Sequence, residues 1–250
     1  MEDHSWVIGD FIWTAFDYIG EASIGWCGDP LDKRIFPWNH ANCGDLNLSG
    51  ERRPQSYLRE TLWSDAPVSH IVVTPPVPSF PLNPNKADWS VWDFPDVVDH
   101  WNFPGYEGKK MTVSVYSNCE QVELFLNGES LGKQENTADK KNTLVWEVPY
   151  AHGILKAVSY NKGGEVGTAT LESAGKVEKI RLSADRTEIV ADGNDLSYIT
   201  LELVDSKGIR NQLAEELVEF SIAGDATIEG VGNANPMSLS LIHISEPTRH

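Results

Sequence analysis

Residues 7–25 read VIGDFIWTAFDYIGEASIG, and this stretch decides the fold that the sequence predicts. It begins with an apolar run from Val7 to Trp13, as expected of a strand that is buried on both faces of a sheet. The carboxylates Asp17 and Glu21 follow, and a turn containing glycine ends the stretch. In α/β barrels the carboxyl ends of the strands carry the binding and catalytic residues. We therefore predict a buried parallel strand whose carboxyl end opens into a cleft.

Two short motifs in this stretch resemble a known enzyme family. Residues 9–14 (GDFIWT) and 17–21 (DYIGE) resemble the eighth barrel strand of glycoside hydrolase family 2, the family of β-galactosidases and β-glucuronidases. That strand lies near the end of the catalytic barrel, so the resemblance implies that most of a catalytic domain precedes it in the parent protein. The resemblance covers roughly residues 5–237 and is strongest in 7–25 and 43–63.

Residues 53–63 are predicted to form a helix, which resembles the last barrel helix of the family. Pro54 suits the first helical turn, where the missing N–H is no loss. The spacing of four apolar residues predicts one apolar face, made of Tyr57, Leu58, Leu62 and Trp63. Six prolines between residues 67 and 84 then predict an extended linker.

The pattern after residue 99 is typical of short antiparallel strands. Alternating or β-rich runs predict strands at 111–116, 122–126, 131–133, 144–148 and 154–160. Asn127-Gly128 predicts a tight hairpin turn, and residues 161–164 predict a second one. This spacing indicates an immunoglobulin-type sandwich, and it resembles the domain that follows the barrel in many family 2 enzymes.

A second β unit is predicted from about residue 174. Its strands are expected at 180–182, 187–190, 197–204 and 218–222. Residues 191–196 (ADGNDL) resemble a bacterial immunoglobulin-like, invasin-type domain. Residues 240–249 (SLIHISEPTR) do not continue the pattern and resemble a translated sequencing adapter.

The predicted fold class is therefore mainly β, with the end of a (β/α)8 barrel followed by two immunoglobulin-like sandwiches. The expected domains are the barrel end in 1–65, the linker and first sandwich in 66–173, a truncated second sandwich in 174–237, and a non-native tail in 238–250.

Composition excludes several classes of function. A formal net charge of −17 argues against nucleic-acid binding and suits a neutral substrate better than an anionic one. Cys27, Cys43 and Cys119 are too scattered for a disulfide framework or a structural zinc site, and no His-x-x-x-His motif occurs. No phosphate-binding loop and no membrane-spanning run is present, so we expect no cofactor, no metal and no membrane span. The resemblance implies a bacterial parent that is periplasmic or secreted.

The resemblance also implies where the chemistry takes place. Family members hydrolyse glycosides with retention, which requires two carboxyl groups about 5 Å apart. The family takes its acid/base Glu from the fourth barrel strand and its nucleophile Glu from the seventh, both upstream of this chain. We therefore expect no catalytic residue here and an inactive polypeptide. For Asp17 and Glu21, supporting or loop-ordering roles are favoured over direct catalysis.

Trp13 and Asp45 are the candidate substrate-binding residues. An indole at the mouth of a barrel offers a flat apolar face to a sugar, with its N–H free to donate; the alternative is a core Trp below the cleft. β-Glucuronidases place an Asn-x-Lys pair before the last helix to grip the substrate carboxylate. Aligned through Pro54, this chain has Cys43-Gly44-Asp45, and an Asp would repel a uronate. The expected ligand is a terminal neutral sugar, a β-galactoside; Asp45 either binds a sugar hydroxyl or caps its loop.

The alternative function is a noncatalytic β-sandwich protein for carbohydrate binding or adhesion. Its surface could be formed by Trp89, Trp92, Trp101 and Phe103, although packing against neighbouring segments is the favoured role of these aromatic residues. The barrel-strand motif favours the enzyme, because an adhesion protein has no use for a strand that needs a barrel to bury it.

Overall fold

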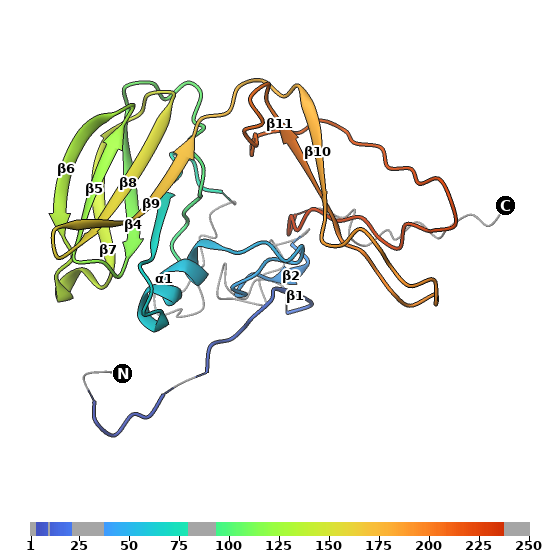
Figure 1. Cartoon of the computed structure of the whole chain (residues 1–250), viewed down its shortest axis with the longest axis horizontal. Coiled ribbons are helices and arrows are strands. Elements are labelled where there is room, and N and C mark those ends of the chain that lie inside the picture. The colour runs from blue at the N-terminus through green and yellow to red at the C-terminus, as the bar shows by residue number, and fades with distance from the viewer. Residues whose placement is uncertain (1–3, 10, 22–37, 80–93, 238–250) are drawn as a thin grey trace. The chain divides into compact units, whose positions relative to one another are not determined.

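The computed structural model describes residues 4–9, 11–21, 38–79 and 94–237. It is mainly β, as predicted (Figure 1). The chain divides into two compact units, one formed by 1–60, 77–96 and 219–250 and the other by 61–76 and 97–218. The elements of the first unit are β1 (Tyr18–Ile19), β2 (His40–Ala41) and most of α1 (Pro54–Trp63).

The second unit contains a sandwich of two antiparallel sheets. One sheet has the order β3-β4-β7 and the other the order β6-β5-β8-β9 (Figure 1). These strands are β3 (Ser69–Val73), β4 (Lys110–Ser117), β5 (Gln121–Leu126), β6 (Glu129–Glu135), β7 (Thr143–Pro149), β8 (Ile154–Asn161) and β9 (Gly164–Glu172), with a short 3-10 helix at Ala138–Lys140. The strands predicted from the pattern after residue 99 are all present. The immunoglobulin type of the sandwich stays a prediction.

The core of the sandwich follows from the period of two along its strands. In β7, Leu144, Trp146 and Val148 are buried, whereas Val145 and Glu147 between them are exposed. Each fully buried side chain of this size contributes about 1.5–3 kcal/mol relative to exposure. The core cluster comprises Ile71, Val73, Trp101, Phe103, Met111, Val113, Val115, Val122, Leu124, Leu144, Trp146, Val148, Tyr150, Leu155 and Ala157.

The two predicted hairpin turns are confirmed. Asn127 and Gly128 join β5 to β6 with φ of 53° and 86°, as a two-residue turn with two left-handed positions requires. Lys162 and Gly163 join β8 to β9 with φ of 51° and 78°.

The predicted linker is wrong in one part, because residues 69–73 form β3. This strand pairs with β4, and Ile71 and Val73 are buried in the core. Trp101 and Phe103 also lie in the core, so packing is their role; Trp89 and Trp92 lie outside the described residues. The Trp101 indole N–H donates to the Ala151 carbonyl at 2.9 Å, which satisfies its only polar group.

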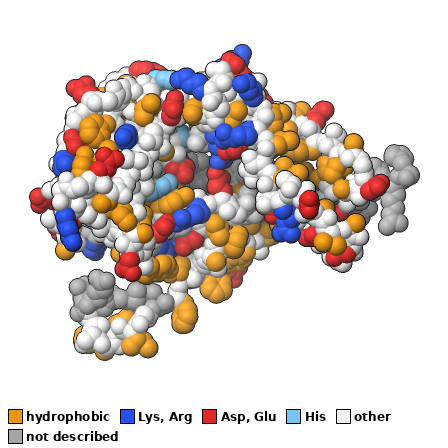
Figure 2. Space-filling view, in the orientation of Figure 1, with side chains coloured by type: hydrophobic (Ala, Val, Ile, Leu, Met, Phe, Trp, Pro, Cys, Tyr) orange, Lys and Arg blue, Asp and Glu red, His pale blue; other side chains and the backbone are white. Residues whose placement is uncertain are grey.

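The second β unit is an antiparallel ribbon of β10 (Lys179–Ala184) and β11 (Ile199–Val204). Residues 187–190 and 218–222, where strands were predicted, are irregular. A two-stranded ribbon cannot bury both of its faces. Ile180, Leu182 and Ile199 are accordingly exposed, and hydrophobic side chains are visible on the surface in Figure 2.

The predicted helix is confirmed, but the predicted strand at 7–13 and the apolar helix face are not. Residues 7–9 and 11–13 form no strand, and Ile8 and Phe11 are fully exposed. No described segment forms a ladder with them, and a barrel strand needs a neighbour on each side. In α1, Gln55 and Thr61 are buried, whereas Leu62 and Trp63 are exposed. The barrel end stays a prediction.

Candidate functional site

The two predicted site residues come from segments that are far apart in sequence and adjacent in space. Residues 14–17 run beside 43–46, with a parallel bridge between Phe16 and Leu46. The Asp45 N–H donates to the Thr14 carbonyl at 3.0 Å. The Leu46 N–H donates to the Ala15 carbonyl at 2.9 Å, and the Asp17 N–H donates to the Leu46 carbonyl at 2.9 Å. These bonds fix the backbone on which Trp13 and Asp45 are carried.

Trp13 is an exposed residue, with a relative exposure of 59%. Its Nε1–H donates to the Tyr18 hydroxyl at 3.1 Å, and the two rings meet edge to face with centroids 6.2 Å apart. The expectation of a free indole N–H is therefore wrong for this chain, because Tyr18 occupies it. The Trp13–Thr14 peptide bond is cis. The predicted contact of Trp13 with sugar stays a prediction.

Tyr18 links the indole to a carboxylate. Its hydroxyl donates to the Glu21 carboxylate. Partial burial, together with the hydrogen bond to Glu21, raises the pKa of the Tyr18 phenol above its ordinary value. The phenol is therefore protonated at neutral pH, which it must be to donate this bond.

Asp17 is a buried carboxylate whose partners are structural. It accepts from the Gly44 N–H at 2.7 Å and pairs with Arg53 Nη1 at 3.0 Å. Burial raises the pKa of Asp17 above its ordinary value, although Arg53 and the Gly44 N–H act in the opposite direction. Burial also lowers the pKa of Arg53. These contacts favour the loop-ordering role of Asp17, because they tie residue 17 to the loop before α1.

Gly44 is a positioning residue that the sequence analysis missed. A Cβ at this position would lie 2.2 Å from the Asp17 backbone nitrogen and 2.6 Å from the Leu46 carbonyl oxygen, so only glycine fits. Its own carbonyl accepts from Gln55 Nε2 at 2.6 Å. Gln55 and Arg53 were also missed; the one signal was their place at the start of a predicted helix, which turns both side chains toward the preceding loop.

Asp45 is not a lone carboxylate, because it forms an ion pair with Arg59 of α1. Both side chains are about one-quarter exposed. Burial lowers the pKa of Arg59, but its charge still offsets that of Asp45. This pair favours the loop-capping alternative for Asp45, whose contact with a sugar hydroxyl stays a prediction.

His40 is a fully buried imidazole. Burial lowers its pKa to about 4, and Arg53 adds to this effect. Nδ1 lies 2.9 Å from Asn39 Oδ1, while Nε2 has no hydrogen-bond partner within the described part of the chain. Cys43 is buried nearby, and burial raises the pKa of its thiol. Neither group is charged at neutral pH.

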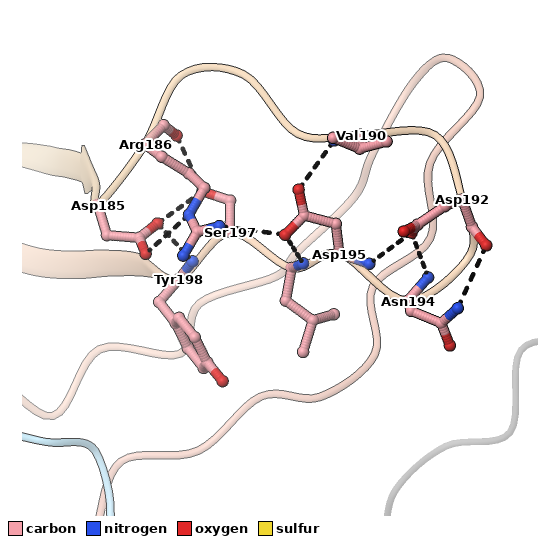
Figure 3. Close-up of polar contacts among 9 residues, drawn as sticks. Asp185, Arg186, Val190, Asp192, Asn194, Asp195, Ser197 and Tyr198 are labelled. Carbon is pink, nitrogen blue, oxygen red and sulfur yellow. Dashed lines mark hydrogen bonds and ion pairs between the residues drawn. The ribbon is translucent and has the colours of Figure 1, made fainter.

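The three aspartates of the 185–198 loop are occupied by the chain itself (Figure 3). Asp195 accepts from the Val190 N–H at 2.8 Å and from Arg186 at 3.1 Å. Asp192 accepts from the N–H groups of Asn194 and Asp195 at 2.8 and 2.9 Å. Among the described residues, no group of three or more potential ligands is arranged to hold a metal ion. In that same part of the chain no helix could cross a membrane.

Two family descriptions match the chain. A domain of unknown function, DUF4982, matches residues 108–167, and "Glycoside hydrolase family 2 C-terminal domain 5" matches residues 180–248. The second match extends into residues 238–248, which the sequence predicts to be a non-native tail and which lie outside the described residues.

Individual relatives agree with these matches. A beta-galactosidase of Bacteroides ovatus is 32% identical, over 96% of this chain and 24% of that protein. A putative beta-glucuronidase of Formosa agariphila is 29% identical, over 95% of this chain and 20% of that protein. A solved glycosyl hydrolase family 2 member from Bacteroides cellulosilyticus is 97% identical with a TM-score of 0.93, over 96% of this chain and 31% of that one.

Over nearly its whole length, the chain is therefore similar to the C-terminal part of glycoside hydrolases. It belongs to glycoside hydrolase family 2 and corresponds to a C-terminal segment of its members. It spans less than a third of the length of these relatives.

Proposed function

We propose that this chain is the C-terminal segment of a retaining exo-β-glycosidase that removes a terminal β-linked neutral sugar, most specifically a β-galactoside. In this proposal residues 1–65 complete a catalytic barrel whose two carboxyl groups come from upstream. Trp13 supplies an apolar face to the sugar. The segment alone is catalytically inactive, because it lacks both nucleophile and proton donor.

The observation that carries the proposal is the exposed aromatic ring of Trp13 beside the tied segments 14–17 and 43–46. Such a ring stacks on the C–H face of a sugar. The exposed apolar side chains of Ile8 and Phe11 support the barrel part, because they lack the neighbours that a buried strand requires.

The choice of a neutral sugar as the substrate is argued from the residue at position 45 and from the names of the relatives. No lysine stands at that position to bind a uronate carboxylate. Repulsion by Asp45 is weaker than a lone carboxylate would give, since Arg59 pairs with it. The relative from Bacteroides ovatus, 32% identical, is named a beta-galactosidase, whereas the relative from Formosa agariphila is named a putative beta-glucuronidase.

A chimera tests the proposal. The chimera is the Bacteroides cellulosilyticus family 2 protein in which this chain replaces the matching segment, which is 31% of that protein. We expect the chimera to hydrolyse a chromogenic β-galactoside faster than the corresponding β-glucuronide, while the isolated 250-residue chain hydrolyses neither. The unmodified Bacteroides cellulosilyticus protein is the control. Turnover by the isolated chain would refute the proposed inactivity of the segment. A preference of the chimera for the glucuronide would refute the neutral sugar.

A further inference from the structure

The Trp13 ring stands at the end of a row of two hydrogen bonds, Trp13 to Tyr18 and Tyr18 to Glu21, and chemistry fixes the direction of both. An indole N–H can only donate, and an ionised carboxylate can only accept. The single phenol proton of Tyr18 therefore points to Glu21, and an oxygen lone pair of Tyr18 faces Trp13 Nε1 at 3.1 Å. In any other arrangement, one of the two bonds would be lost.

We propose that Tyr18, oriented by Glu21, is a positioning residue that holds the Trp13 indole ready to receive the apolar face of a terminal sugar. The identity of the ligand rests on the proposed function. The positioning itself rests on the hydrogen bonds that join Trp13, Tyr18 and Glu21.

The phenol is carried on a fixed part of the backbone. Tyr18 pairs with Ala41 of β2, and Ala41 is completely buried. Its neighbour Asp17 is tied to Arg53 and to the Gly44 N–H. Tyr18 therefore has a defined position from which to select one orientation of Trp13.

The indole itself has little else to hold it. Trp13 is 59% exposed, and within the described residues the one hydrogen bond of its indole is to Tyr18. An exposed aromatic side chain that is not held samples several rotamers, and fixing it on binding has an entropic cost. The bond to Tyr18 meets this cost before the sugar arrives.

The same bond limits what Trp13 can recognise. Because its N–H is occupied by Tyr18, the indole has no donor left for a sugar hydroxyl. Trp13 then offers only its apolar face, and the hydroxyls of the sugar must be recognised by other groups. A flat apolar contact of this kind binds ground state and transition state similarly, so it acts mainly on KM.

A double-mutant cycle in the chimera tests the coupling. Tyr18→Phe removes the acceptor and keeps the ring; we expect KM to rise about two- to twelvefold, the worth of one hydrogen bond. The value of kcat should remain within about twofold.

In a Trp13→Phe background, which has no indole N–H, Tyr18→Phe should change nothing further. Tyr198→Phe, which removes the hydroxyl of an exposed tyrosine, is the matched control. Equal effects of Tyr18→Phe in both backgrounds would overturn the inference.

A second measurement does not depend on activity. In the chimera labelled with fluorotryptophan, the ¹⁹F signal of Trp13 is the one that Trp13→Phe removes. Tyr18→Phe should shift or broaden it, and Tyr198→Phe should not. An unchanged Trp13 signal would overturn the positioning role. A chimera without turnover in which Tyr18→Phe still moves the signal would refute the proposed function and support the positioning of Trp13. If Tyr18→Phe does not fold, Glu21→Ala tests the same chain from its exposed end.

Discussion

At the scale of single residues, Gly44 shows how the absence of a side chain builds a site. Its α-carbon lies against the backbone of both Asp17 and Leu46, and neither backbone can rotate away as a side chain could. We expect Gly44→Ala to destabilise the unit that contains it by about 1–3 kcal/mol, the usual cost of overpacking. Thermal unfolding of the chimera measures this.

The control for this substitution is Gly230→Ala. A Cβ at residue 230 meets nothing within 4 Å, and its φ is not in the left-handed region. Gly230→Ala should leave the melting temperature nearly unchanged. If Gly44→Ala is equally harmless, the close approach of residues 14–17 to 43–46 does not exist in solution.

Trp13 offers a test of substrate contact at the same scale. In the chimera, Trp13→Ala should raise KM and lower kcat/KM by about 5- to 150-fold, equivalent to roughly 1–3 kcal/mol for a lost stacking contact. Steady-state kinetics with the chromogenic β-galactoside measure this. Unchanged kinetics in a variant that melts like the parent would mean that the exposed ring of Trp13 faces away from the sugar.

At the scale of elements, the sequence predicts strands best where local signals surround them. The alternation in β4, β5 and β7 lies beside strong turn residues, so these strands are predictable without tertiary information. β3 was missed because its five residues lie among prolines, and its burial comes from long-range pairing with β4. The exposed Leu62 shows the converse error, since a helical spacing alone does not tell which face is covered.

The site was predictable only in part, because some of its contacts depend on tertiary structure and leave no local signal in the sequence. Trp13 follows from the strand-end motif, and its exposure agrees with a surface role. Its partner Tyr18 does not follow, because nothing in the motif indicates that these two side chains, five residues apart, come within hydrogen-bond distance. The pairing of Asp45 with Arg59 also depends on the placement of α1 against this loop.

His100 carries a prediction about the pH dependence of the sandwich unit. Its Nδ1 accepts from the Asn102 N–H at 3.2 Å, and the ring lies 4.9 Å from that of Phe103. Burial lowers the pKa of His100 to about 4, and the positive charge of Arg210 adds to this. Protonation would abolish the acceptor at Nδ1. The folded state therefore requires the neutral ring.

The sign of the effect follows from proton uptake. Between pH 6.5, the ordinary value, and about 4, the unfolded chain binds a proton that folded His100 refuses. The free energy of unfolding should therefore fall as the pH is lowered through this window, by up to about 3 kcal/mol. His100→Asn keeps an acceptor near the same place and should flatten the dependence, whereas His152→Asn at an exposed position should not. Parallel pH profiles of the melting temperature for all three proteins would disprove the assignment.

At the scale of the whole chain, the two ends of the sequence differ from its middle in how they bury apolar surface. Ile8, Phe11 and Leu217 are nearly fully exposed, whereas Val113, Leu124 and Leu155 in the sandwich have no exposed surface. Exposed apolar groups of this size contribute nothing to the free energy of unfolding of the isolated chain. The sandwich is therefore the part that we expect to fold without help.

Limited proteolysis of the isolated chain tests this. Residues 1–65 should be trimmed first, because their apolar side chains lack a core. The β10–β11 ribbon should be cut next, since its exposed apolar faces leave it marginally stable. A resistant product should span about residues 66–173 and begin before β3, because Ile71 and Val73 are part of the sandwich core. Mass spectrometry of the products identifies the ends.

The chimera is the control, and in it residues 7–63 should resist cleavage. Protection of those residues in the isolated monomer would mean that they form a folded unit by themselves, and the proposed barrel end would have to be abandoned.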